Sequence, residues 1–195
     1  FESDSCDVSM NLNSFSGNLN NYSIVLDPND FDGFGFDLNL QSLVGPYRPQ
    51  DGVIRAGSDY FAWLAAVPNG NVNGTITVNG VKKKIKGSGY HDHNWGNTPL
   101  QKLFKSWTWF RGKAGPYTVI LAELNATESR GGFDIPILFV ADENQVLVDK
   151  FGNRELLTMK NELIKDYYPS KNEPQFSNFL MSSNNGITVN ISGNE

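Results

Sequence analysis

Residues 72–86 read VNGTITVNGVKKKIK, and this stretch decides the fold class. Two runs rich in β-branched residues, 72–78 and 81–86, flank the pair Asn79-Gly80. Asn-Gly supplies the two positive φ angles that a type I′ turn requires, so this pair joins two antiparallel strands with little strain. Residues 72–86 are therefore predicted to form a β-hairpin.

Similar runs follow one another along the chain, separated by Gly, Asn, Asp and Pro about every ten residues. The alternation is clearest at 34–44, where Phe34, Phe36, Leu38 and Leu40 alternate with small or polar residues. Further strands are predicted at 22–27, 60–67, 106–111, 117–124, 135–141, 146–149 and 186–191. Short strands at this spacing are typical of an all-β barrel or sandwich.

One segment departs from the strand pattern. Between residues 154 and 166, the apolar residues Leu156, Met159, Leu163 and Ile164 recur at helical spacing among good helix formers. We therefore predict one short helix near 154–166.

Composition narrows the function classes. A chain of 195 residues can bury one substantial core, and a formal net charge of −5 argues against nucleic-acid binding. No run of 18 uncharged apolar residues occurs, so we expect no transmembrane segment. Cys6 is the single cysteine, so the chain cannot form an internal disulfide, and its cysteine content does not indicate a redox compartment. Because the sequence begins at Phe1, we expect it to be part of a longer protein.

The most unusual stretch is residues 87–96, GSGYHDHNWG, which holds both histidines of the chain. Five groups that exchange or share protons stand side by side at positions 90 to 94. Glycines on both flanks permit a bulge or a close backbone approach, and such irregularities recur beside functional sites. We therefore place the candidate site here.

This stretch carries a family resemblance. The pattern Gly-x-Gly-Tyr-x-Asp-His-Asn-Trp-Gly resembles the signature of the carotenoid 1,2-hydratase (hydroxyneurosporene synthase) and AttH-like family, with the fungal decalin-forming Diels–Alderases as more distant relatives. The surrounding sequence is similar as well: Tyr60-Phe61-Ala62-Trp63 and Gly74-Thr75-Ile76 precede the motif, and Trp107-Thr108-Trp109 follows it. The resemblance covers about residues 27–141.

The resemblance implies an architecture. It implies a lipocalin-like antiparallel β-barrel, which we place at residues 1–150. Residues 151–195 would then be a C-terminal helix and strand segment that begins a second barrel. Because members of the family have two such barrels in tandem, a second barrel domain outside this chain is an expected partner.

The resemblance also implies a chemistry that needs no cofactor. Asp92 is similar to an aspartate thought to protonate an alkene, and Tyr90 to its tyrosine neighbour. Trp63 is similar to an aromatic that steadies the resulting cation, and we expect His91, His93 and Trp107 to contact the ligand too. A carboxyl withdrawn from water stays protonated near neutral pH, and aromatic faces stabilise a carbocation. The implied activity is a hydratase (lyase), isomerase or cyclase acting on an apolar isoprenoid or polyene.

Strand geometry conflicts with this assignment unless the pleat is interrupted. An unbroken strand from Val81 places Tyr90 and Asp92 on the face of Lys82 and Lys84, which is expected to be wet. One extra residue reverses that parity, so we predict a bulge at residues 87–89.

Three other interpretations stay open. The same cavity could carry a hydrophobic ligand without any chemistry. His93, Asn94 and Trp95 could form a hydrogen-bonded plug that closes one end of the barrel. His91 and His93 share a strand face, as the metal ligands of cupins do, but the chain has no third histidine and no glutamate close behind. We therefore expect no metal.

Overall fold

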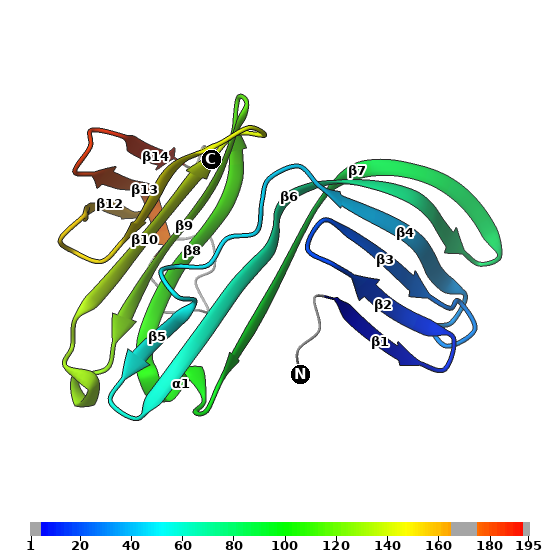
Figure 1. Ribbon diagram of the computed structural model, residues 1–195, viewed down its shortest axis with the longest axis horizontal. Coiled ribbons are helices and arrows are strands. Elements are labelled where there is room, and N and C mark those ends of the chain that lie inside the picture. The colour runs from blue at the N-terminus through cyan, green and yellow to red at the C-terminus, as the bar shows by residue number, and fades with distance from the viewer. Residues whose placement is uncertain (1–4, 165–174, 193–195) are drawn as a thin grey trace.

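The computed structural model describes residues 5–164 and 175–192. Antiparallel strands dominate these residues, whose helical elements are the one-turn helix α1 (Leu100–Leu103) and a 3₁₀ turn at Glu128–Arg130. The strands are β1 (Cys6–Met10), β2 (Asn13–Gly17), β3 (Asn21–Leu26), β4 (Phe34–Ser42), β5 (Val53–Ala56), β6 (Asp59–Val78), β7 (Val81–Gly96), β8 (Phe104–Ala114), β9 (Tyr117–Ala126), β10 (Asp134–Ala141), β11 (Val146–Phe151), β12 (Leu156–Ile164), β13 (Gln175–Ser183) and β14 (Thr188–Ser192) (Figure 1). The predicted all-β class is confirmed.

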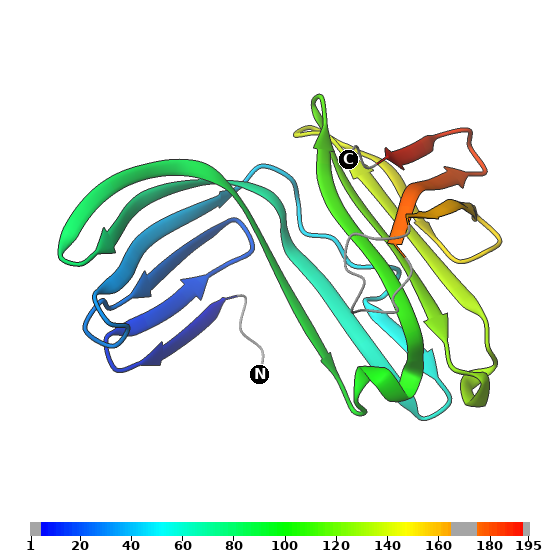
Figure 2. The same cartoon turned by 180° about the vertical axis from the view of Figure 1, so that it is seen from behind.

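The strands form three sheets. The first has seven strands in the order β1-β2-β3-β4-β6-β5, with β7 also paired to β6. The second has the order β11-β10-β9-β8, and the third has the order β12-β13-β14. Strands β6 and β7 have 20 and 16 residues. One end of each lies with β1 to β4 in the N-terminal lobe, and the other end lies beside the second and third sheets in what we call the second lobe (Figures 1 and 2). These two long strands therefore belong to both lobes.

The predicted hairpin is present between β6 and β7. Asn79 and Gly80 have φ angles of 49° and 79°, as a type I′ turn requires. The pairing runs without interruption from Val78↔Val81 to Gly70↔Gly89. The local rule for Asn-Gly therefore predicted this turn and its register correctly.

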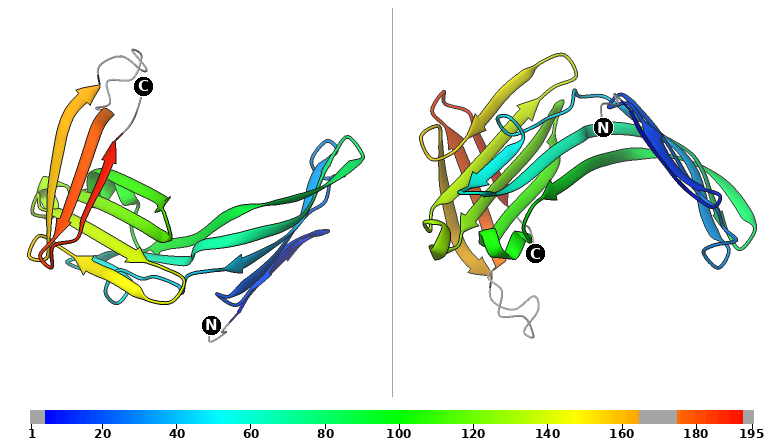
Figure 3. Two further views of the ribbon diagram at one scale, coloured as in Figure 1. Left: turned by 90° about the horizontal axis from the view of Figure 1, so that it is seen from above. Right: turned by 60° about the horizontal axis from the view of Figure 1, so that its bottom comes forward.

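Alternating side chains of the second sheet fill two cores. The inner-facing residues Ile120, Ala122, Ile137 and Phe139 pack with Tyr47 and Trp63. The outer-facing residues Val119, Leu121, Leu138 and Val140 pack with Leu156, Phe179 and Met181 of the third sheet, which covers this outer face (Figure 3). The inner core thus joins the second sheet to β6, and the site is built beside it.

The helix predicted near 154–166 is wrong. Residues 156–164 form strand β12, which pairs with β13, and residues 165 and 166 lie outside the described residues. Leu156 is 2% exposed, whereas Leu157 is 71% exposed, which is the alternation of a strand. Cross-strand pairing and burial against the second sheet outweigh the helix propensity of the segment. The α-helix of the described residues is α1 instead.

Candidate functional site

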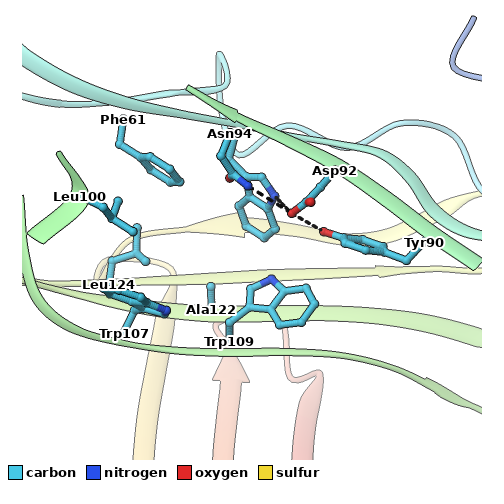
Figure 4. Close-up of a pocket in the computed structure, with 10 residues that line it drawn as sticks. Phe61, Tyr90, Asp92, Asn94, Leu100, Trp107, Trp109, Ala122 and Leu124 are labelled. Atoms are coloured by element: carbon cyan, nitrogen blue, oxygen red, sulfur yellow. Dashed lines mark hydrogen bonds between the residues drawn. The ribbon is translucent and has the colours of Figure 1, made fainter. Parts of the chain in front are cut away.

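A cavity of about 390 Å³ lies where β6 and β7 face β8 and β9 (Figure 4). Among the described residues, β7 and β8 are not paired with each other, so the cavity lies along a seam between the first and second sheets. Ten residues line it: Phe61, Trp63, Tyr90, Asp92, Asn94, Leu100, Trp107, Trp109, Ala122 and Leu124. Its volume is within the range of small-molecule sites.

Asp92 is the centre of the polar part of this cavity. Its Oδ2 atom accepts hydrogen bonds from Trp63 Nε1 at 3.1 Å, from Tyr90 Oη at 3.1 Å and, at a longer 3.5 Å, from Asn94 Nδ2. The three donors come from two neighbouring strands, and Trp63 is almost fully buried. Three donors on one oxygen are suited to the negative charge that a carboxyl develops when it gives up its proton.

The pleat of β7 separates the motif into two faces. Tyr90, Asp92 and Asn94 line the cavity, whereas His91 and His93 belong to the opposite face. The bulge predicted at residues 87–89 is wrong, because the register shifts lie between Leu64 and Val67 and between Val67 and Gly70, where β6 has the extra residues.

Tyr90 and Asp92 reach the cavity without a change in the alternation of β7, because this strand lies between two cores and neither of its faces is fully exposed. Tyr90 packs against the inner core of the second lobe. The His91 ring meets Phe15 and Tyr22 of the N-terminal lobe edge-on, with centroids 4.9 and 4.8 Å away. Burial lowers the pKa of His91; the Asp92 charge opposes this shift and His93 adds to it. His93 is exposed and stacks on Trp95. Neither histidine is among the residues that line the cavity.

Strand β8 supplies the opposite wall. Trp107 and Trp109 are two residues apart, so both project into the cavity, and they remain 48% and 46% exposed. The Trp109 ring lies 5.7 Å from the Tyr90 ring, and the Arg111 guanidinium lies 5.1 Å from the same ring. Arg111 also donates to the backbone carbonyls of Pro68 and Gly89, which ties β8 to β6 and β7 across the seam.

These contacts fix Tyr90 as a hydrogen-bond donor. Burial raises the pKa of the Tyr90 hydroxyl well above its usual range, Asp92 raises it further, and the Arg111 charge opposes the shift. The phenol therefore keeps its proton at neutral pH. It donates that proton to Asp92 without releasing it.

A second layer of aromatic rings holds Trp63. Tyr47 packs edge-on against Trp63 with ring centroids 6.2 Å apart, and it stacks on Phe139 with centroids 4.3 Å apart. Tyr47 is 3% exposed, and its hydroxyl has no hydrogen-bond partner among the described residues. Burial raises the pKa of this hydroxyl, and Asp149 adds to the effect. Tyr47 thus acts here as an aromatic support.

The predicted residues Trp63, Tyr90, Asp92 and Trp107 come together at this cavity. Phe61, Asn94 and Trp109 line it as well and were not predicted, although each is two residues from a predicted one on the same strand. Period-two alternation could therefore have identified them. Leu100, Ala122 and Leu124 carried no such signal.

The structure gives no group of three or more His, Cys, Asp or Glu side chains within residues 5–164 and 175–192 that could hold a metal ion. No helix in the same ranges is long and apolar enough to cross a membrane. The chemistry available to the cavity is that of one carboxyl, its three donors and the surrounding rings.

The fold and the site together define a class: an antiparallel β protein with a carboxyl set in an aromatic cavity. The family model described as Diels-Alderase-like matches residues 18–154, and the chain belongs to this family. The broad family relationship expected from the motif is therefore confirmed.

Sequence relatives agree with this placement. A quinolone epoxide rearrangement protein of Penicillium thymicola is 30% identical over 105 residues, which are 51% of this chain and 28% of that protein. One of Emericella nidulans is 28% identical over 124 residues, 62% of this chain and 34% of that protein. A hydroxyneurosporene dehydrogenase of Chlorobaculum tepidum is 31% identical over 65 residues, 30% of this chain and 17% of that protein. The chain thus spans between 17% and 34% of the length of these relatives.

A solved structure shares the fold. Kievitone hydratase of Nectria haematococca superposes with a TM-score of 0.62 at 17% identity, over 96% of this chain and 57% of that one. At this identity the likeness shows the fold alone. The fold is of the lipocalin-like class predicted from the sequence, although the sheets of the described residues do not join into one closed ring.

Proposed function

We propose that this chain carries the site of a cofactor-free enzyme that isomerises, cyclises or hydrates an apolar, unsaturated small molecule by proton transfer from Asp92. The observation that carries the proposal is the convergence of Trp63, Tyr90 and Asn94 on the Oδ2 atom of Asp92, within a cavity whose other walls are aromatic or aliphatic.

In the proposed step, Asp92 gives the proton on its Oδ1 atom to a carbon of a substrate double bond. The O–H bond breaks, a C–H bond forms from the π electrons, and a carbocation results beside a carboxylate. The three donors on Oδ2 are already in place for the negative charge, so little reorganisation is needed. The rings of Trp63 and Trp109 stabilise the positive charge.

The carbocation then has two outcomes. Loss of a proton from a neighbouring carbon back to the Asp92 carboxylate gives an isomerised product. The product is cyclised when a second double bond of the substrate first attacks the carbocation, which forms a C–C bond and moves the positive charge to another carbon before that proton is lost. Addition of water, with its extra proton returning to Asp92, gives a hydrated product. Both outcomes restore Asp92, and neither requires a redox change or a group carrier.

The names of the relatives support this reaction class. Two of them are epoxide rearrangement proteins, and the structural neighbour is a hydratase. The assignment to the carotenoid hydratase branch is part of the proposal. So is the division into a barrel at residues 1–150 and the start of a second barrel at residues 151–195, with the rest of the second barrel outside this chain. The cavity walls favour an apolar substrate, since Asp92 and Asn94 are their most polar members.

The test compares matched variants. Native mass spectrometry of the protein from its own host identifies a co-purifying molecule; that molecule, a quinolone epoxide and kievitone are then offered to the wild type, Asp92→Asn and Asp37→Asn. Asp37 is an exposed carboxyl on β4, so its variant controls for the loss of one negative charge. Turnover should fall about a hundredfold or more in Asp92→Asn and remain unchanged in Asp37→Asn.

Two results contradict the proposal. Wild-type turnover in Asp92→Asn would remove the acid role. Tight retention of the co-purified molecule without conversion by the wild type would instead support the carrier interpretation.

A further inference from the structure

The charge of the cavity walls has one sign. Asp92 is the one ionisable carboxyl among the ten lining residues, and no lysine, arginine or histidine is among them. The other polar lining groups are neutral: the Tyr90 hydroxyl, the indole nitrogens and the Asn94 amide, whose nitrogen donates to Asp92. A ligand in this cavity therefore meets one acidic group and no basic one.

Aromatic rings surround this acidic group on several sides. In Figure 4, Phe61, Tyr90, Trp107 and Trp109 point into the same space as Asp92 and come from three different strands. Trp63 completes the set and donates its Nε1–H to Asp92, so its ring is held at a fixed position. The electron-rich face of an aromatic ring attracts a cation, most strongly for tryptophan.

We propose that the cavity binds organic cations, with an alkylammonium group placed between the rings and Asp92 as its counter-ion. The Oδ1 atom of Asp92 can face such a group, because the hydrogen bonds that Asp92 accepts within the described part of the chain all end on Oδ2. The inference rests on the proposed function, since an ammonium beside the Asp92 carboxylate has the charges of the ion pair formed by proton transfer. Such a cation binds the ionised form of Asp92 and mimics the carbocation, so it acts as an inhibitor of the proposed reaction rather than as its substrate.

Arg111 places a positive charge against one of these rings without lining the cavity. Its guanidinium lies over the Tyr90 ring and donates to the carbonyls of Pro68 and Gly89. Arg111 is not among the lining residues, but its charge already lies against the Tyr90 ring. Tyr90 is therefore the least favourable of the rings for a cation, and Trp63 and Trp109 are the most favourable.

The experiment uses two probes of nearly the same shape. Benzyltrimethylammonium carries a positive charge, and neopentylbenzene has a carbon in place of its nitrogen and is neutral. Binding is followed by tryptophan fluorescence, because three of the four tryptophans of the chain line the cavity. The cation should bind the wild type about tenfold more tightly than its neutral counterpart.

Three variants locate the preference. Asp92→Asn should weaken cation binding about tenfold and change the neutral probe less than twofold. Trp109→Leu should weaken binding of the cation more than binding of the neutral probe. Trp95→Leu is the matched control, because Trp95 is about as exposed as Trp109 but stacks on His93 outside the cavity. Thermal unfolding of each variant confirms that it is folded.

The outcomes separate this inference from the proposed function. Equal or tighter binding of the neutral probe, binding of neither probe, or a cation preference that survives Asp92→Asn would each overturn the inference. Any of these results can occur while turnover still depends on Asp92, in which case the enzyme proposal stands. If the cation preference is observed but turnover does not depend on Asp92, the inference stands and the enzyme proposal is contradicted.

Discussion

Tyr90 and Tyr47 differ in the hydrogen bonding of their hydroxyl groups, and removing each hydroxyl tests this difference. Tyr90→Phe and Tyr47→Phe each remove a single hydroxyl and leave a ring of the same size. The Tyr90 hydroxyl donates to Asp92 at 3.1 Å, whereas the Tyr47 hydroxyl is buried without a partner among the described residues. The two variants should therefore change the free energy of unfolding in opposite directions.

The magnitudes follow from the environment of each hydroxyl. An unpaired buried hydroxyl costs about 1–3 kcal/mol, so Tyr47→Phe should raise the free energy of unfolding by about 1 kcal/mol. A typical intramolecular hydrogen bond contributes about 0.5–1.5 kcal/mol, less where water competes. Tyr90 is partly exposed, so Tyr90→Phe should lower the free energy of unfolding by about 1 kcal/mol.

Equilibrium unfolding in urea measures both variants. The midpoints should move to opposite sides of the wild-type midpoint while the slope of each transition stays the same. A clearly lower midpoint for Tyr47→Phe would mean that its hydroxyl has a hydrogen-bond partner, for example an ordered water. An unchanged midpoint for Tyr90→Phe would mean that its bond to Asp92 contributes nothing, and the geometry of the site would need revision.

Two further predictions concern the framework of the site. Gly74→Ala should lower the free energy of unfolding by about 3 kcal/mol or more, because the φ angle is 150° and a Cβ would lie 2.1 Å from the Asp37 carbonyl oxygen. Gly80→Ala, where a Cβ meets no atom within 4 Å but φ is 79°, should cost only about 1–2 kcal/mol in the same urea titration. The pKa of His91 is lowered in the folded protein, so as the pH falls His91 is protonated in the unfolded chain before it is protonated in the folded one. The stability that the neutral ring contributes is therefore complete above pH 6.5 and is lost as the pH falls through the folded-state pKa. Urea midpoints at pH 7.5 and 5.5 should therefore differ less in His91→Phe than in the wild type, and an equal effect of His93→Phe would contradict the assignment to His91.

The parts of the fold that the sequence predicted depend on neighbouring residues. The turn at Asn79-Gly80 follows from two backbone angles, and the division of Tyr90 and Asp92 from His91 and His93 follows from the pleat. Strands β1, β2 and β5 were not predicted, because they are short and two of them are rich in polar residues. Their pairing partners supply the signal that their own sequences lack.

The errors have a common physical cause. The helical spacing of residues 154–166 was real, but β12 is set by its pairing with β13 and by the core beneath it. The bulges lie in β6 rather than β7, because a register shift is a property of two strands and only their mutual fit decides which one carries the extra residue. The supporting contact of Tyr47 with Trp63 likewise joins a loop to a strand, and no local pattern indicates it.

Proton transfer from Asp92 to a bound carbon is the central claim, and heavy water tests it most directly. The molecule that co-purifies with the protein is converted in D₂O, and the product is analysed by mass spectrometry and NMR. The proposal predicts one deuterium on a single carbon of the wild-type product and no such product from Asp92→Asn. A wild-type product without carbon-bound deuterium would contradict it.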